Sequence, residues 1–315
     1  MGKWRNVFFG GMISIMLVFG LMFIGCNDEN NQDGNNQDGN QDEDNPKYTL
    51  VPDASTLPSI AQKFGITDAT KDGVETTFSA LHELISAPNS GDDFTQVIKL
   101  GDYIDLPSLT VAGDAGHLAD PDYGYINVTS ALRLIVIGIN SFNGKNGNNT
   151  SHVVFHFQNI PGTHKMNTAD DNTTGYLTSA MRSYITGNFL TGLKNAGVPD
   201  GFLWAPSRRV ASNGGSSAEA QTITDKLWLP TAWEMTGEQS YSVACESSSN
   251  QASFVGFYKN DAARKKTGND TSYWLASPNY STINATHFCR IGVYGEPVSI
   301  NASALLGCVP AFCVR

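Results

Sequence analysis

The side chains with the most reactive chemistry lie in the second half of the sequence. Cys245, Cys289, Cys308 and Cys313 are four thiols that could form disulfides or attack a substrate as thiolates. Four thiols in an oxidising compartment allow three pairings, all of which stay open, and buried thiols are the alternative. Because an odd number separates Cys308 from Cys313, they would face opposite sides of one straight strand and could not bond to each other.

Histidines give no second set of reactive groups. His152 and His156 are four residues apart, which suits two metal ligands on a helix, but they fall in a run that is predicted to be extended. His287 shares a strand face with Cys289, yet no third orienting group accompanies them. The sequence also lacks a phosphate loop, a dinucleotide fingerprint, a zinc-protease motif and a nucleophile elbow. We therefore predict no metal site, no cofactor and no catalytic residue.

Recognition through loop side chains is better supported. Tyr280 lies in a polar stretch between Asn279 and Asn284, and Tyr294 follows in the same part of the chain. Loops on a rigid scaffold often carry binding residues, and tyrosine rings contact both sugars and proteins. We expect Asn279, Tyr280, Asn284 and Tyr294 to bind a ligand.

The elements that must position these residues are mixed. Residues 71–87 place apolar side chains at helical spacing, and residues 178–195 predict a second helix that is capped by Thr178. Two short strands are predicted within 94–111, and a hairpin is predicted between the apolar runs 132–139 and 152–160. Further short strands are expected at residues 202–206, 226–229, 273–276, 287–294 and 308–314. Helices therefore precede strands, which predicts an α+β fold with mostly antiparallel short strands and a few helices.

The N-terminus carries an export pattern. Lys3 and Arg5 precede a 19-residue apolar run, Val7 to Gly25, that ends at Cys26. The sequence Phe23-Ile24-Gly25-Cys26 resembles the lipobox of bacterial lipoproteins, which implies a signal peptide over 1–25 and lipidation of Cys26. An uncleaved membrane anchor is the alternative, since about 20 apolar residues span a bilayer. Either outcome places the rest of the chain outside the cytoplasm, in the cell envelope.

An acidic segment follows the cysteine. Residues 26–45 contain seven acidic side chains and no basic ones, which predicts a disordered tether. Residues 46–100 are then expected to form a helical N-terminal extension, and residues 101–315 the α+β domain. The net charge of -10 disfavours nucleic acid as a partner, because that binding requires clustered basic residues.

Six short motifs follow one another from Gly101 to the end of the sequence: GDY at 101–103, HVVFHFQNIPG at 152–162, SAMR at 179–182, LWLPTAWEM at 227–235, YWLASP at 273–278 and VPAFCVR at 309–315. In this order they resemble a bacterial and phage-associated domain family of unknown function. The last two are similar to the closing strands of C-type-lectin-like folds, which implies such a fold for the C-terminal half. Two departures matter: Glu296-Pro297-Val298 is only a fragment of the calcium-dependent sugar motif, and Cys289-Arg290-Ile291-Gly292 lacks the thiol pair of formylglycine-generating enzymes.

The sequence thus predicts a lipid-anchored lipoprotein of the cell envelope. Its partners are the membrane, through the lipid, and a protein or glycan ligand that a binding or adhesion module would hold. Two alternatives remain open: a cysteine-dependent enzyme on a scaffold like that of formylglycine-generating enzymes, and a structural envelope lipoprotein.

Overall fold

The computed structural model describes residues 59–87, 93–114, 124–215, 218–238, 243, 245–246, 250–266, 272–279 and 285–315. The chain divides into two units, 1–45 and 46–315, and every described residue belongs to the second. Cys26, Tyr280 and Asn284, like the expected signal peptide and tether, lie outside the described residues. None of the helices in the described ranges is both long and apolar enough to span a membrane.

The helices are short except for α2. They are α1 (Ile60–Lys63), α2 (Lys71–Ser86), α3 (Asp93–Val97), α4 (Ala180–Tyr184), the π-helix η1 (Ile185–Phe189), α5 (Leu190–Asn195), the 3-10 helix η2 (Asp200–Phe202), α6 (Ala232–Thr236) and α7 (Asp261–Arg264).

The strands are also short. They are β1 (Tyr103–Leu106), β2 (Leu109–Val111), β3 (Ile126–Val128), β4 (Leu132–Ile139), β5 (Val153–Phe157), β6 (Gly162–Lys165), β7 (Leu203–Trp204), β8 (Ser207–Ala211), β9 (Ala220–Thr224), β10 (Leu227–Trp228), β11 (Tyr273–Pro278), β12 (His287–Ile291), β13 (Pro297–Asn301), β14 (Leu305–Cys308) and β15 (Ala311–Val314).

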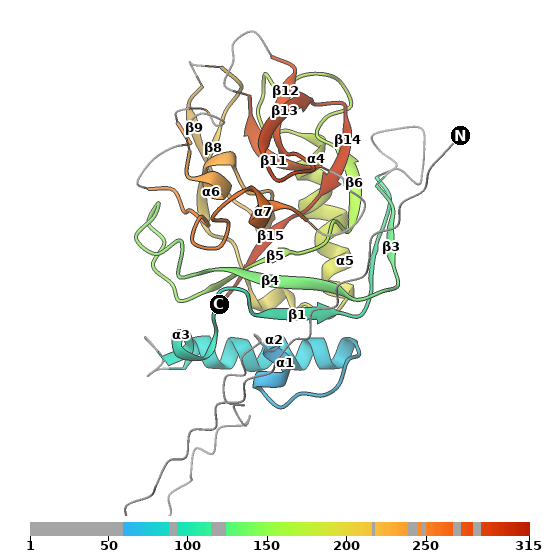
Figure 1. Ribbon diagram of the computed structural model, residues 1–315, viewed down its shortest axis with the longest axis vertical. Coiled ribbons are helices and arrows are strands. Elements are labelled where there is room, and N and C mark those ends of the chain that lie inside the picture. Colours follow the sequence, from blue (N-terminus) through green and yellow to red (C-terminus); the bar gives the residue numbers. More distant parts are fainter. Residues whose placement is uncertain are drawn as a thin grey trace, which may run out of the picture. The chain divides into compact units, whose positions relative to one another are not determined.

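Two sheets form the body of the described region (Figure 1). The first has the order β1-β4-β5-β15-β10, with β7 also paired to β15, and the second has the order β13-β12-β11-β14-β6. Within these sheets only β11 and β14 pair in parallel. The predicted α+β class with mostly antiparallel strands is therefore confirmed.

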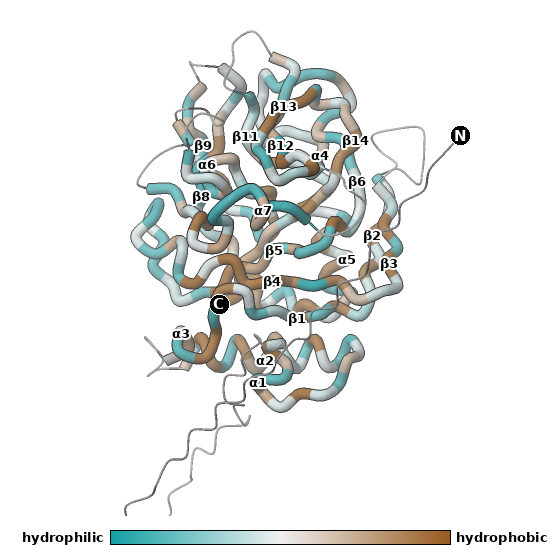
Figure 2. The backbone as a smooth tube through the Cα atoms, viewed as in Figure 1, coloured by the Kyte–Doolittle hydropathy of each residue, from teal (hydrophilic) through white to brown (hydrophobic). Residues whose placement is uncertain are grey.

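The core joins the N-terminal helices to the sheets. Phe78 of α2 contacts the rings of Phe155 in β5 and Phe312 in β15, with centroids 5.7 and 6.3 Å apart. Ile60 of α1 belongs to the same buried cluster. Figure 2 shows that hydrophilic residues gather instead in the segment around α7. Helices from the expected N-terminal extension therefore share one core with the strands that follow them.

The long local patterns were predicted correctly. Helix α2 buries Val74, Phe78, Leu81 and Ile85 on one face, as helical spacing requires. Strands β4 and β5 form the predicted antiparallel hairpin, with a register shift between Val136 and Gly138.

Two short strands, β1 and β2, lie within residues 94–111 as predicted, but the segment 94–97 before them belongs to α3. There, Ile98 N donates to Phe94 O at 2.8 Å and closes a helical turn that buries both side chains. The cap of the later helix was predicted one residue too early. The helix after residue 178 is capped by Ser179, whose Oγ accepts from Arg182 N at 3.1 Å. Its middle widens into the π-helix η1 around Gly187.

Candidate functional site

The β12–β13 hairpin carries the most exposed aromatic side chain of the described region. In its turn, Gly292 N donates to Glu296 O at 2.7 Å and Gly295 N donates to Gly292 O at 3.0 Å. Tyr294 N donates to a carboxylate oxygen of Glu296 at 3.0 Å. These bonds fix the turn, while the Tyr294 side chain remains 77% exposed.

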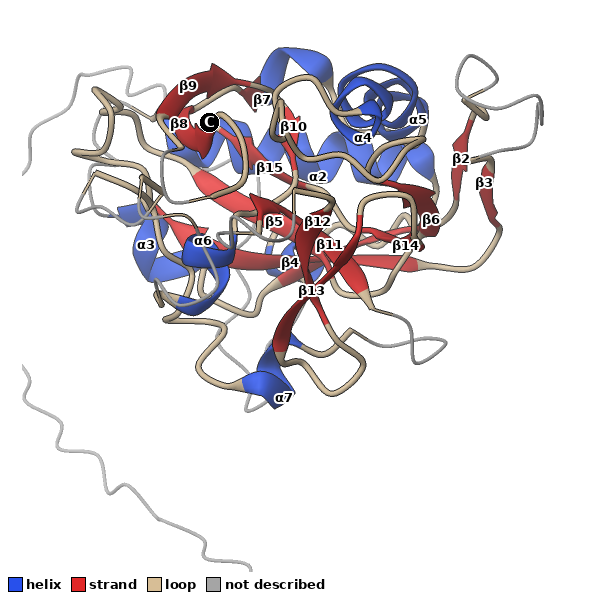
Figure 3. Ribbon diagram, turned by 90° about the horizontal axis from the view of Figure 1, so that it is seen from above, coloured by secondary structure: helices blue, strands red, loops and turns tan. Residues whose placement is uncertain are grey.

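Helix α7 supports this turn from the protein side, and Figure 3 shows it beside the end of β13. Arg264 Nε donates to Gly295 O at 3.1 Å, and its guanidinium pairs with Asp261. Gly295 has a φ of 93°, and a Cβ there would lie 1.8 Å from Asp261 O. The turn therefore requires glycine, and α7 holds Tyr294 in a defined position.

Asn279, one of the expected ligand contacts, is held by hydrogen bonds within the protein. It is only 8% exposed, and its Nδ2 donates to Ser299 Oγ at 2.6 Å. Its main-chain N donates to His287 O at 3.0 Å, and its main-chain O accepts from Gly215 N at 3.2 Å. These bonds join the end of β11 to β12, β13 and the loop after β8.

The structure also separates Asn279 from Tyr294. Asn279 bonds to His287, the first residue of β12, whereas Tyr294 follows Ile291, the last residue of that strand. Five residues of extended chain span about 13 Å at ~3.3 Å per step. The described residues of the expected contact set thus lie at opposite ends of one strand, and only Tyr294 is exposed.

A buried ion pair joins strand β8 to helix α6. Arg208 of β8 donates to Glu234 of α6 through Nε at 3.0 Å and Nη2 at 2.5 Å, and neither side chain is exposed. Glu234 also accepts from Thr231 N at 2.8 Å, which completes a capping box at the start of α6. Arg208 in addition lies 4.7 Å from the centre of the Trp228 ring.

A second buried carboxyl group lies nearby. Glu246 accepts from Ala211 N at 3.0 Å and from the Ser277 hydroxyl group. Burial raises the pKa of Glu246 to about 7, although these hydrogen bonds act in the opposite direction. Ser277 Oγ in turn accepts from Ala232 N at 2.8 Å, so the network joins β11 to α6.

A family model for a domain of unknown function (DUF6273) matches residues 150–315, which is more than half of the chain. The chain belongs to the DUF6273 family. No curated protein and no solved structure gives a significant match. The DUF6273 match includes the ion pair, the Glu246 network and the Tyr294 turn, and it confirms the predicted membership of a family of unknown function.

Several residues of the sequence motifs that fall within the DUF6273 match are interior residues. Trp228, Glu234, Trp274, Ser277 and Phe312 all have exposed fractions of 0%. Their side chains are therefore part of the packed interior of the described region. The capping-box spacing of Thr231 and Glu234 was the only sequence signal for these networks.

His152, directly before β5, and His156, within β5, are held by hydrogen bonds inside the protein. His152 accepts from Phe142 N at 3.2 Å and contacts Thr150 O at 2.6 Å, and burial lowers its pKa to about 4. His156 contacts Val309 O at 2.9 Å. Both side chains are buried, and the run that holds them is extended as predicted. The described residues contain no cluster of three or more metal-ligating side chains.

The cysteines of the DUF6273 domain are thiols, and no disulfide joins the four in the structure. Burial raises the pKa of Cys289, Cys308 and Cys313, and that of the half-buried Cys245 to about 11. Protonated thiols are poor nucleophiles, so the surroundings do not favour thiolate chemistry. This arrangement corresponds to the buried-thiol alternative.

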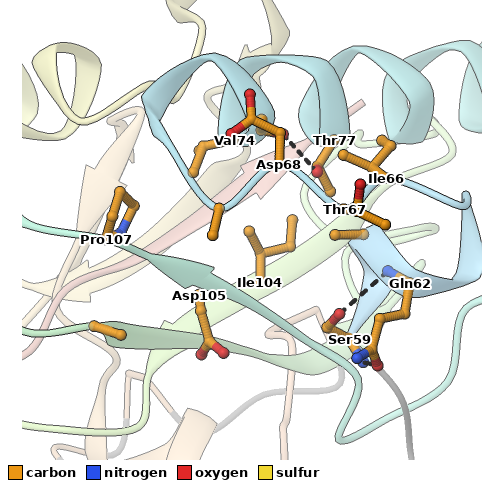
Figure 4. A pocket seen from close by; sticks show the side chains of 14 residues that line it. Ser59, Gln62, Ile66, Thr67, Asp68, Val74, Thr77, Ile104, Asp105 and Pro107 are labelled. Atoms are coloured by element: carbon orange, nitrogen blue, oxygen red, sulfur yellow. Dashed lines mark hydrogen bonds between the residues drawn. The ribbon is translucent and has the colours of Figure 1, made fainter.

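A pocket of about 610 Å³ lies outside the DUF6273 match, between α1, the start of α2 and β1 (Figure 4). Its apolar wall includes Ile66, Val74, Ile104 and Pro107. Asp105 at its edge pairs with Arg133 at 2.9 Å.

Four other polar side chains around this pocket bond to the protein itself. Ser59 and Gln62 form reciprocal hydrogen bonds of 3.2 Å, and Thr77 Oγ1 donates to Gly73 O at 2.7 Å (Figure 4). Asp68 accepts from Thr70 N at 2.8 Å at the start of α2. The pocket therefore offers a ligand mainly apolar contact, and its polar groups serve the local fold.

Proposed function

We propose that this protein is a binding module that is anchored by a lipid at Cys26, stands outside the cytoplasm and contacts a protein or glycan through the Tyr294 turn. The exposure of Tyr294 is the observation that carries the proposal. An aromatic ring that is 77% exposed costs hydrophobic free energy in the isolated protein, and burying it against a partner regains that free energy.

The rigidity of the turn supports the same conclusion. Arg264 and the main-chain bonds of Gly292 and Gly295 order the backbone before any partner binds. A preformed contact loses less conformational entropy on binding than a flexible one. Trp228 and Trp274, which lie in the C-terminal half of the sequence, are in contrast fully buried and cannot contact a partner.

A C-type-lectin-like fold for the C-terminal half belongs to this proposal. Its support is the antiparallel sheet of β11, β12 and β13 together with the closing strand β15, which follows the Val309-Pro310 pair. Rigid sheets of this kind suit the presentation of variable loops. A determined structure with a different strand connectivity from such folds would overturn this part.

The lipid anchor rests on the lipobox-like sequence that ends at Cys26. We expect palmitate labelling of the wild-type chain and its recovery with membranes, and loss of both in the Cys26→Ser variant. Mass spectrometry identifies the modified residue. An unmodified Cys26 in a cytosolic pool would contradict the anchor and the location together.

The binding proposal is tested with the full chain in detergent on arrays of glycans and of envelope and host-surface proteins. For any ligand found, Tyr294→Ala should weaken binding by roughly 30-fold, as loss of an aromatic hot spot of about 2 kcal/mol implies. Tyr125→Ala is the matched control, because Tyr125 is also exposed, at 51%, but lies beside β3. Its effect should stay within about twofold.

Two outcomes would overturn the binding proposal. One is the absence of any ligand on the arrays, which would favour a structural envelope role. The other is equal binding by wild type and Tyr294→Ala, which would place the contact elsewhere on the protein.

A further inference from the structure

A buried lysine lies two residues after the end of α7, the helix that supports the Tyr294 turn. Lys266 is 8% exposed, and its Nζ lies 2.9 Å from His156 Nδ1 and 3.1 Å from the Tyr258 hydroxyl oxygen. The centre of the Tyr258 ring is 5.3 Å from the same nitrogen, and that of the Tyr273 ring is 5.7 Å away. His156, Tyr258 and Tyr273 are each no more than 1% exposed.

These surroundings do not neutralise a charged amine. No ion pair among the described residues includes Lys266, and the residue directly before it in the chain, Lys265, is also basic. Arg264 pairs with the exposed Asp261. The tyrosine rings favour a cation only modestly, whereas burial of an unpaired ammonium group is costly. Burial accordingly lowers the pKa of Lys266 well below its ordinary value.

The imidazole next to the amine is also neutral. His156 Nε2 lies 2.9 Å from Val309 O and can only donate to it, so Nδ1 carries the single acceptor lone pair, which faces both the Tyr258 hydroxyl and Lys266 Nζ. Burial and the neighbouring Lys266 lower the pKa of His156. A proton added to either base would place a positive charge in a site that β5, β11 and the segment around α7 enclose.

The same segment is mechanically connected to the turn. Arg264, two residues before Lys266, donates to Gly295 O at 3.1 Å and accepts at its main-chain O from the Tyr273 hydroxyl at 2.8 Å. Its Nη1 also lies 3.4 Å from Tyr258 O. Displacement of Lys266 would therefore disturb the contacts that hold α7 against the turn.

We propose that Lys266 and His156 form a proton-sensitive latch, in which the neutral pair keeps α7 docked and protonation releases α7 together with the turn that presents Tyr294. The importance of the turn rests on the proposed binding function, whereas the latch itself is measured without any ligand. Acid should favour the released state, because water can hydrate the ammonium or imidazolium ion only in that state. One linked proton changes the opening equilibrium up to about tenfold per pH unit.

Hydrogen exchange of the full chain between pH 9 and 4.5, corrected for the intrinsic pH dependence of exchange, tests the latch. Protection of residues 258–266 and 292–296 should fall by at least about tenfold toward acid, while that of α2 stays nearly constant. Lys266→Met, which keeps the length and removes the charge, should abolish most of this fall. Lys194→Met is the control and should behave as wild type, since Lys194 is 43% exposed.

Three results would overturn the latch: constant protection in the wild type, an unchanged fall in Lys266→Met, or loss of protection in α2 to the same extent as in α7. The wild-type profile alone decides the question if Lys266→Met does not fold. Failure of the latch would leave weakened binding by Tyr294→Ala at pH 8 intact, so the two proposals fail separately.

Discussion

Removal of Glu234 should destabilise the protein far more than removal of an exposed carboxylate in an equivalent ion pair. Glu234→Ala leaves the Arg208 guanidinium 0% exposed and without its two carboxylate contacts of 3.0 and 2.5 Å. Breaking a buried pair in this way costs about 3–5 kcal/mol. Loss of the bond from Thr231 N adds about 1 kcal/mol, for a total of about 4–6 kcal/mol.

The chain provides a matched control. Arg133 and Asp105 form a bidentate pair with distances of 2.9 and 3.2 Å, but their side chains are 37% and 40% exposed. Water and salt screen such a pair, so Asp105→Ala should cost no more than ~1 kcal/mol. Thermal and urea unfolding should therefore separate the variants, with a decrease in Tm of roughly 10–20 °C for Glu234→Ala.

A double variant distinguishes charge from packing. Arg208→Met with Glu234→Leu removes both charges and fills a similar volume, so it should be at least about 2 kcal/mol more stable than Glu234→Ala. Equal losses of stability in Glu234→Ala and Asp105→Ala would refute the reasoning. They would mean that the Arg208 guanidinium can reach water when its partner is removed.

Three further predictions concern the cap of α4 and two buried titratable groups. Ser179→Ala should lower the free energy of unfolding by about 1 kcal/mol, measured in urea, while Thr178→Ala should leave it nearly unchanged. Glu246 has a pKa of about 7 in the folded state, so it stabilises the protein in acid, and that stability is lost as pH rises from about 4.5 to 7. In the wild type, the free energy of unfolding should therefore fall by an amount on the order of 3 kcal/mol over this range, and Glu246→Gln should not show this fall. His152 acts in the opposite sense, because its pKa of about 4 keeps it neutral in the folded state while the unfolded chain gains a proton below pH 6.5. The free energy of unfolding should therefore fall by an amount on the order of 3 kcal/mol as pH is lowered from 6.5 to 4, and His152→Gln should not show this fall. If the unfolding free energy of Glu246→Gln or His152→Gln varied with pH as in the wild type, the burial of that group would be contradicted.

Elements with long periodic patterns could be predicted because burial alone determines them. In α2, Val74, Phe78 and Leu81 fall on one face and all are buried. The β4 run pairs with β5 because both strands are apolar and a turn-rich segment joins them. In such elements the local sequence and the tertiary packing favour the same structure.

Strands with polar sequences could not be predicted in this way. Strand β8 contains Arg208 and Arg209, and β9 contains Gln221 and Thr222, yet they pair along their whole lengths. The ion pair of Arg208 with Glu234 compensates for the charge that β8 buries, and the partner is 26 residues away. Likewise, 110 residues separate His156 from Lys266, so no local pattern indicates their contact.

The candidate site was only partly accessible to sequence reasoning. Composition indicated a polar loop with tyrosine and asparagine, and of the expected contact residues that the structure describes, Tyr294 is exposed. Composition could not show that the Tyr294 ring is exposed whereas the Asn279 amide is buried. Asn279 is buried because Ser299 of β13 and His287 of β12 offer it hydrogen-bond partners, a consequence of strand order that the sequence does not contain.

Membership of the DUF6273 family and the location of the site lead to different kinds of inference. The motif residues Trp228, Glu234, Trp274 and Ser277 lie in the interior, where they contribute to the packing of the sheets and α6. A partner meets the exposed residues instead, and Tyr294 is the most exposed large side chain among the described apolar and aromatic ones. Substituting motif residues would therefore report on stability, whereas the proposed binding function is tested by substituting Tyr294 and the residues that support its turn, Arg264 and Gly295.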